Sequence, residues 1–234
     1  MSASARVDTI QMDDVSVRFA DTDVLRNVCC SLPARTTAVI GENGSGKSTF
    51  ARLIGGLARA DSGTVRVLGL DPARETAALR RRVAVVFSNP DAQIVMPTVA
   101  EDVAFSLRSE KLPRAEKTRR TQAALERFGL TALADRPTHD LSGGQKQLLA
   151  LCGAFVREPD LVIADEPTAF LDARNARLIA DRLLKNGSHR VLLVTHDLDL
   201  AQRCDQAVLI SQGTITAVGA PGGIVKAYQE LLVC

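Results

Sequence analysis

The sequence predicts an α/β protein with a mostly parallel sheet, antiparallel strands near the N-terminus and an inserted α-helical subdomain. Strand-like and helix-like segments alternate along most of the 234 residues, as in proteins whose helices cover a parallel sheet. Three later segments are almost continuously apolar, which is typical of central strands that are buried on both faces. These segments are residues 82–87, 160–164 and 190–194.

The first part of the chain predicts two kinds of strand. Residues 14–19 and 63–68 alternate between apolar and polar side chains, which indicates antiparallel strands with one exposed face. Residues 36–40 are rich in β-branched side chains and predict a buried strand. Residues 49–54 follow it as a predicted helix, so a strand, a short loop and a helix succeed one another here.

Between residues 88 and 159 the sequence predicts helices and no strand. Capping-box patterns at residues 98–101 and 142–145 open two of these helices, and a third is predicted over residues 113–128, ended by Gly129. We therefore expect the helical block to be inserted into the α/β core. The expected organisation is a single domain of residues 1–234, with a core of residues 1–87 and 159–234 and a helical subdomain of residues 88–158.

Charge and composition exclude several classes of protein. The net charge is +2 with nearly equal numbers of acidic and basic residues, which gives no strong electrostatic footprint for nucleic acid. The longest apolar run, residues 148–156, is too short to span a bilayer, and the N-terminus lacks the apolar core of a signal peptide. The five cysteines show no metal-ligand spacing and receive no functional role. We expect a cytosolic protein unless a partner holds it at a membrane.

Residues 41–48, the phosphate loop, fit the pattern G-x-x-x-x-G-K-[ST] between a predicted strand and a predicted helix. Glycines let consecutive N–H groups surround phosphate oxygens, and the helix start adds its positive dipole end. Lys47 supplies a charge for the β- and γ-phosphates, and the Ser48 hydroxyl is a ligand for Mg²⁺. A glycine-rich turn with an incidental lysine is the alternative, which this context disfavours. The candidate nucleotide-binding residues are Gly41, Asn43, Gly44, Ser45, Gly46, Lys47, Ser48 and Thr49.

Residues 141–145, with the sequence Leu-Ser-Gly-Gly-Gln, form a second candidate anion site at a predicted helix start. A serine hydroxyl and glycine N–H groups suit an anion, and the missing side chains let a phosphate approach closely. An ordinary capped helix is the alternative, but the motif lies shortly before an acidic strand end, which argues for a function. The candidate residues are Ser142, Gly143, Gly144 and Gln145.

Two carboxylates, Asp165 and Glu166, follow the apolar residues 161–164. At the end of a parallel strand they would project into the crevice in which open α/β sheets bind ligands. Asp165 would hold Mg²⁺, directly or through water, and Glu166 would orient and polarise the attacking water. Adjacent strand residues point to opposite faces, so the two carboxylates can serve two roles. A solvated acidic turn is the alternative, and the order of the motifs argues against it.

These motifs, in this order, resemble those of the ATP-binding cassette (ABC) ATPases from about Asp14 to the C-terminus. The resemblance implies a P-loop NTPase core that hydrolyses ATP with Mg²⁺. It implies that residues 142–145 are the signature motif, which contacts the γ-phosphate held by a second subunit. His196 matches the switch histidine at the γ-phosphate. Asp172 ends the segment 169–172, which matches the D-loop that crosses the dimer interface.

Three positions need separate comment. Phe19 lies where the family stacks an aromatic ring on adenine, but core packing is an equally strong alternative. Phe170 is bulky for the D-loop. Ser88 stands where the family has a glutamine that approaches Mg²⁺ and the attacking water and reports the nucleotide state to the membrane partner. Serine is too short to reach the same point without a bridging water or a backbone movement, so either hydrolysis is tuned differently or another group substitutes.

The next residues resemble a subfamily. Residues 89–94, Asn-Pro-Asp-Ala-Gln-Ile, are similar to the motif that opens the short Q-helix of energy-coupling factor (ECF) transporter ATPases. A helix is physically reasonable here, because Asn89 can cap it, Pro90 suits its first position and Asp91 favours its positive end. Gln93 would be presented from the first turn as a coupling residue, together with Ser88. A capped helix with an incidental glutamine is the alternative.

The resemblance implies the ATPase subunit of an ECF-type importer for a vitamin or a transition-metal ion. Two copies would bind two MgATP, close, hydrolyse and push on a membrane partner. The expected partners are a second copy of the chain, a transmembrane coupling protein and a substrate-binding membrane component, with no nucleic acid. The expected location is the cytoplasmic face of the cell membrane. The chain ends soon after Gly223 without the longer extension of many ECF ATPases, which favours biotin as substrate and a homodimer.

Two other classes stay open. A conventional ABC importer ATPase, for amino acids or metal chelates, would share the catalytic motifs and differ mainly around residues 88–94. A non-transport ABC protein acting on DNA or the ribosome would usually show a very long coiled-coil insertion or a second cassette. Basic clusters at residues 80–82 and 114–120 suggest nucleic acid or lipid headgroups, but helical faces with interspersed glutamates are more often solvated.

Overall fold

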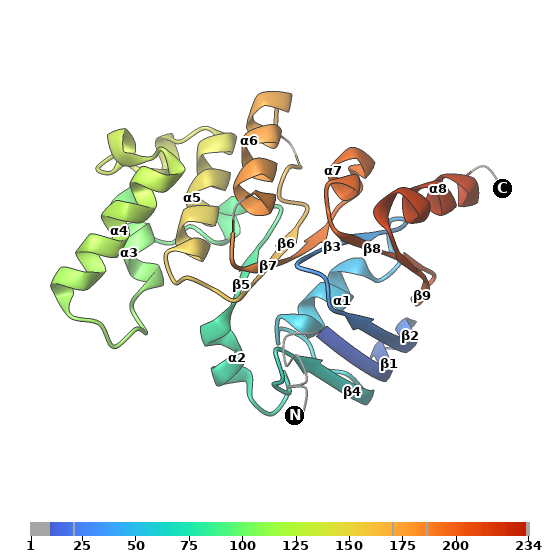
Figure 1. Cartoon of the computed structure of the whole chain (residues 1–234). Coiled ribbons are helices and arrows are strands. Elements are labelled where there is room, and N and C mark those ends of the chain that lie inside the picture. Colours follow the sequence, from blue (N-terminus) through green and yellow to red (C-terminus); the bar gives the residue numbers. More distant parts are fainter. Residues whose placement is uncertain (1–9, 21, 170, 186, 233–234) are drawn as a thin grey trace, which may run out of the picture. The chain divides into compact units, whose positions relative to one another are not determined.

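Figure 1 shows the computed structural model of the chain, which describes residues 10–20, 22–169, 171–185 and 187–232. These residues fall into two compact units. The first unit joins the N-terminal part of the chain, up to Val83, with the part from Arg190 onward. The second unit runs from Ala84 to His189, and the expected helical subdomain lies within it.

A three-stranded antiparallel sheet in the first unit contains β1 (Ile10–Phe19), β2 (Thr22–Leu32) and β4 (Ser62–Val67), with β1 in the middle. The two antiparallel strands predicted near the N-terminus, β1 and β4, are therefore confirmed. The sequence does not predict β2. Its buried side chains do not alternate regularly, and its pairing with β1 shifts register three times, so a period of two is lost.

The phosphate loop follows one of the other strands of the first unit. β3 (Thr36–Ile40) lies between β7 (Arg190–Val194) and β8 (Gln206–Ser211) and is parallel to both, while β9 (Thr214–Gly219) pairs antiparallel with β8. All five side chains of β3 are buried, as its apolar and β-branched sequence predicts. The helices of this unit are α1 (Lys47–Ile54), α2 (Thr76–Arg82), α7 (Leu198–Gln202) and α8 (Pro221–Leu231).

The second unit is mainly helical. Its two strands, β5 (Val83–Val86) and β6 (Leu161–Asp165), are neighbours in the sheet. Three of its helices, α3, α4 and α5, pack against one another (Figure 1). Its helices are α3 (Val99–Ser106), α4 (Arg114–Phe128), α5 (Gly143–Phe155) and α6 (Ala173–Leu184), with the short 3₁₀ helices η1 (Pro90–Ala92), η2 (Thr131–Leu133) and η3 (Thr138–Asp140).

The predicted helix ends in the second unit are confirmed by their caps. Thr98 and Ser142 each form a complete capping box, and Gly129 ends α4 in a left-handed conformation with φ 70°. α5 is the most buried of these helices, yet it has only 13 residues. Among the residues that the structure describes, no helix is both long enough and apolar enough to cross a membrane. The two units together contain parallel strands, antiparallel strands and helices, so the mixed α/β fold class is as the sequence predicts.

Most of the cysteines behave as small packing residues. Burial raises the pKa of the Cys30, Cys152 and Cys204 thiols to about 12, so they stay protonated and unreactive at neutral pH. Cys29, in contrast, is exposed. Cys234 lies outside the described residues. Within the described part of the chain, no group of three His, Cys, Asp or Glu side chains could hold a metal ion.

We expect the Phe50→Ala variant to be strongly destabilised. Phe50 lies on α1 and is fully buried, so its truncation leaves a cavity and should lower the free energy of unfolding by about 3–5 kcal/mol. Urea denaturation measures this loss. Leu57→Ala is the control, since Leu57 is 46% exposed and its loss should change stability by no more than about 0.5 kcal/mol. Equal losses in both variants would contradict this account of the core.

Candidate functional site

The phosphate loop connects a buried strand to a helix whose start lacks a side-chain cap. β3 ends at Ile40, the loop follows, and α1 begins at Lys47 with Gly46 at its N-cap position. Gly46 has φ 104°, and Gly44 has φ 77°. A Cβ at Gly41 would overlap the carbonyl oxygen of Ile210, so the loop also needs glycine to pack against β8.

The donors of this loop suit a phosphate group. The Oγ of Ser45 is buried and has no hydrogen-bond partner among the described residues. The N-cap residue of α1 is Gly46, which has no side chain to cap the first turn, so this helix start suits an anion. The Nζ of Lys47 donates to the carbonyl oxygens of Gly41 and Glu42 at 2.8 and 2.6 Å, which holds the ammonium over the loop. The residues present therefore fit the phosphates of a nucleotide.

The remaining candidates of the loop differ in exposure. Asn43 is exposed, Ser48 is half-buried and Thr49 is buried. Ser48 lies in the first turn of α1, and its hydroxyl is the kind of oxygen ligand that Mg²⁺ accepts. Asp165 offers a carboxylate oxygen of the same class from the second unit.

His196 belongs to the same unit as the phosphate loop. It lies two residues beyond β7, and its side chain is exposed. β7 runs parallel to β3, with Val39 opposite Val194, so both strands end at the same edge of the sheet. The turn that carries His196 is held by Asp197, which caps α7 by accepting a hydrogen bond from the Leu200 N–H at 3.0 Å. Strand pairing therefore brings His196 and the phosphate loop to one edge of the sheet.

Phe19 lies at the end of β1 and is 53% exposed. A ring with this exposure does not contribute to the core, so the exposure argues against the packing alternative for this residue. The ring is accessible to a ligand. Adenine stacking stays a prediction.

The second unit carries the acidic pair. Asp165 is the last residue of β6, and both it and Glu166 are half-buried. Glu166 has φ 50°, a left-handed conformation that is uncommon for a residue other than glycine. The turn after it is closed by a hydrogen bond from the Ala169 N–H to the Glu166 carbonyl at 3.1 Å. Asp165 therefore ends the strand, and Glu166 begins the turn that follows it.

The signature motif uses its polar side chains to cap α5. The Oγ of Ser142 accepts a hydrogen bond from the Gln145 N–H at 3.3 Å, and the Oε1 of Gln145 accepts one from the Ser142 N–H at 2.9 Å. The Ser142 hydroxyl keeps its own proton for another acceptor. A Cβ at Gly143 would meet no described atom within 4 Å, so this glycine leaves open space for a ligand.

The structure explains why position 144 is a glycine, which the sequence alone does not. A Cβ at this position would lie 2.7 to 3.0 Å from the side chain of Asn175, so glycine lets α6 pack against the start of α5. Asn175 in turn donates from its N–H and from its Nδ2 to Asp172, at 2.9 and 2.6 Å. These two hydrogen bonds, in that order, lower the pKa of Asp172.

The D-loop residue Asp172 is therefore the N-cap of α6. The pattern Asp-x-x-Asn predicts an N-cap from the sequence. The contact of Asn175 with Gly144 of α5, however, depends on tertiary packing. Phe170 lies outside the described residues, so its bulk in the D-loop stays untested. Asp172, Asn175 and Gly144 form one contact region of the second unit.

The segment after β5 forms one turn of 3₁₀ helix. The Oδ1 of Asn89 caps it by accepting a hydrogen bond from the Asp91 N–H at 3.0 Å, and Pro90 occupies its first position, as predicted. Ser88 is half-buried before it. Gln93 is not simply displayed from the turn: its Oε1 accepts a hydrogen bond from the Phe87 N–H at 2.8 Å, and its amide is therefore directed at the main chain.

Two of the four basic side chains in residues 114–120 of α4 are paired with Glu116. Glu116 binds Arg119 through two hydrogen bonds of 2.7 and 2.8 Å and Arg120 through one of 2.9 Å. Hydrogen bonds from these two guanidinium groups lower the pKa of Glu116 to about 2. The pairing supports a solvated helix face over a nucleic-acid or lipid surface.

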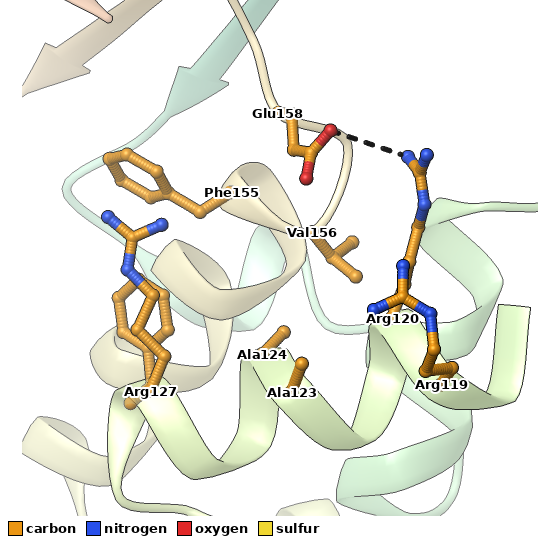
Figure 2. Close-up of a pocket in the computed structure, with 9 residues that line it drawn as sticks. Arg119, Arg120, Ala123, Ala124, Arg127, Phe155, Val156 and Glu158 are labelled. Atoms are coloured by element: carbon orange, nitrogen blue, oxygen red, sulfur yellow. Dashed lines mark ion pairs between the residues drawn. The ribbon is translucent and has the colours of Figure 1, made fainter. Parts of the chain in front are cut away.

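Figure 2 shows a small hollow beside this helix, with a volume of about 130 Å³. Arg120 reaches across it toward Glu158, at 3.7 Å, and the Arg127 guanidinium lies 5.3 Å from the centre of the Phe155 ring. None of the candidate nucleotide-binding or catalytic residues lines this hollow. The arginines that line the hollow thus make their contacts with other residues of the second unit.

Comparisons with known proteins agree with the motifs. Residues 25–169 match the sequence profile of the ABC transporter family. The energy-coupling factor transporter ATP-binding protein EcfA1 of Lacticaseibacillus paracasei is 44% identical over 199 residues, which cover 83% of this chain and 72% of the relative. The biotin transport ATP-binding protein BioM of Rhizobium etli is 36% identical over 222 residues, covering 95% and 98%.

A solved structure is also similar. The cbiO1 protein of Clostridium perfringens, described as part of the ABC transporter complex cbiONQ, aligns with a TM-score of 0.84 and 32% identity, over 96% of this chain and 92% of that one. The fold, the order of the motifs and these relatives lead to one assignment. The chain belongs to the ABC transporter family and is an ATP-hydrolysing, ATP-binding subunit of such a transporter.

Proposed function

We propose that this chain powers an ECF-type importer for a vitamin, with biotin favoured, or for a transition-metal ion. The observation that carries the proposal is η1, the capped 3₁₀ turn that follows β5 and contains Asn89, Pro90 and Asp91. The relatives named for energy coupling and for biotin transport support it. A conventional importer ATPase for amino acids or metal chelates remains the alternative, since it would share the other motifs.

The catalytic roles follow from the chemistry of the side chains. Lys47 and the N–H groups of the phosphate loop would bind the phosphates, and Ser48 and Asp165 would hold Mg²⁺. Mg²⁺, when bound, supplies positive charge to the phosphate oxygens. Glu166 would orient the attacking water through its carboxylate, and His196 would donate a hydrogen bond to the γ-phosphate. These assignments are proposals.

We further propose that the working unit is a homodimer. In this arrangement the signature residues of each copy, Ser142 to Gln145, contact the ATP whose phosphates are bound by the phosphate loop of the other copy. The open space beside Gly143 is compatible with a phosphate at the start of α5. Closure around ATP and reopening after hydrolysis would then move the membrane partners.

The proposed partners are a transmembrane coupling protein and a substrate-binding membrane component. The subunit would lie at the cytoplasmic face of the membrane, held by these partners. Val95, three residues beyond η1, is 61% exposed and offers an apolar contact for a coupling helix. We propose no nucleic-acid partner.

The Glu166→Gln variant should bind ATP but hydrolyse it about 10²- to 10⁴-fold more slowly, because the amide cannot accept a proton from water as the carboxylate does. Phosphate release measures turnover, and gel filtration with ATP should show a trapped dimer. Glu126→Gln, an exposed site on α4, is the matched control and should retain full activity. Unchanged turnover in Glu166→Gln would remove the catalytic role of this residue.

The Phe19→Ala variant tests adenine stacking. Loss of a stacked ring costs about 0.5–1.5 kcal/mol, so ATP affinity should fall about 2- to 10-fold in a nucleotide titration. Because the ring is 53% exposed, the melting temperature should stay unchanged. A lower melting temperature with unchanged affinity would instead assign Phe19 to packing.

The substrate is tested with the membrane partners present. In proteoliposomes that contain the whole transporter, biotin should stimulate ATP hydrolysis, and Co²⁺ or Ni²⁺ should do so if the cargo is a metal ion. Amino acids and metal chelates serve as competing ligands. Stimulation by these alone would favour the conventional importer.

A further inference from the structure

Both main-chain polar groups of Phe87, its N–H and its carbonyl oxygen, are hydrogen-bonded to glutamine side chains. Its N–H donates to the Oε1 of Gln93 at 2.8 Å, and its carbonyl oxygen accepts from the Nε2 of Gln147 at 3.3 Å. Gln147 lies on α5 and is only 2% exposed, whereas Gln93 follows η1 and is half-buried. Two elements far apart in the sequence therefore bind the residue that immediately precedes Ser88.

The side-chain amide of Gln93 binds two main-chain groups at the end of β5 that could otherwise pair with a neighbouring strand. Its Nε2 donates to the carbonyl oxygen of Val85 at 2.8 Å, in addition to the bond that its Oε1 accepts from Phe87. A carbonyl at one residue and the N–H two residues later point to the same side of a strand and pair together in a ladder. A primary amide offers one acceptor and two donors, so it can satisfy both groups.

A fourth polar contact joins the same elements. The Nζ of Lys146 on α5 forms an ion pair of 2.7 Å with the Oδ1 of Asp91 in η1. Lys146 precedes Gln147 and follows the signature motif directly. η1, the end of β5 and the first turns of α5 are thus linked by four polar contacts, all of which lie within the second unit.

We propose that Gln93 and Gln147 are positioning residues for Ser88, an inference that rests on the proposed catalytic site. A serine hydroxyl is separated from the main chain by one carbon atom, so its place is set by the backbone and a single side-chain torsion. A glutamine at position 88 has more torsions through which to adjust, so its amide depends less on the backbone. The two amides hold the main chain of Phe87 and thereby limit where the Ser88 hydroxyl can lie during hydrolysis.

This proposal differs from a coupling role for Gln93 in what the isolated subunit should do. If Gln93 positions Ser88, its loss lowers hydrolysis without any membrane partner. If Gln93 only contacts a partner, its loss changes hydrolysis only when that partner is present. The two roles are therefore separated by assays of the purified chain alone.

In the first experiment, Gln93→Ala and Gln147→Ala should each lower kcat of the isolated subunit about tenfold, with KM for ATP changed less than about twofold. Gln122→Ala, an exposed glutamine on α4, is the control and should behave as wild type. Gln93→Glu keeps an acceptor for Phe87 but places an oxygen against the Val85 carbonyl, so it should also be slow. Wild-type kcat in both alanine variants would overturn the proposal.

In the second experiment, a double-mutant cycle tests whether Gln93 acts through Ser88. Ser88→Ala combined with Gln93→Ala should be no slower than Ser88→Ala alone, because the positioned hydroxyl is already absent. Losses that multiply would show that Gln93 acts elsewhere and would overturn the proposal.

A third measurement does not depend on activity. Hydrogen exchange of the Phe87 amide, followed by NMR, should be about tenfold faster in Gln93→Ala than in wild type, with Gln122→Ala unchanged. Unchanged exchange would overturn the clamp itself. If wild type hydrolyses no ATP, the proposed function fails, and the exchange rate still reports whether the clamp exists.

Discussion

Main-chain hydrogen-bonding groups at the ends of helices and strands are the constraint on which this site depends. Every helix leaves its first N–H groups without partners inside the helix. α5 and α6 are capped by the side chains of Ser142 and Asp172, whereas the N-cap residue of α1 is Gly46, which has no side chain to act as a cap. A phosphate can therefore act at the start of α1 where a capping side chain acts at α5 and α6. The buried strand β3 carries this helix start to the edge of the sheet, where β7 also ends.

The same constraint gives the signature residues a structural duty beside their proposed ligand contact. Ser142 and Gln145 cap α5, and Gly144 makes room for Asn175. Losing a capping side chain costs about 0.5–2 kcal/mol of stability. A signature variant that loses activity is therefore not by itself evidence for phosphate contact. Stability has to be measured with it. Gly143 is the position least affected by this ambiguity, because a Cβ added there would meet no described atom within 4 Å.

The sequence is sufficient where the physical signal is local. Apolar runs locate β3, β6 and β7, and capping boxes locate the starts of α3 and α5. β2 escapes because bulges break its period, and an exposed Phe19 cannot be told from a buried one by its position alone. The contacts of Gln93 and Gly144 also escape, because they depend on where β5 and α6 come to lie. Local patterns predict the elements and the motifs, whereas side-chain bonds to a distant main chain require the fold.

The left-handed conformation of Glu166 has a consequence for the history of the sequence. Such a conformation costs a residue other than glycine on the order of 1–3 kcal/mol, and a whole domain is stable by only about 5–15 kcal/mol. Glycine would relax this turn, so selection or design for thermal tolerance alone would drift toward glycine at position 166. If Glu166 has the proposed catalytic role, selection for turnover keeps the carboxylate at this position. A lineage that abandons hydrolysis should then lose Glu166 early, while the capping residues of α5 and α6, which stabilise the fold, should persist longer.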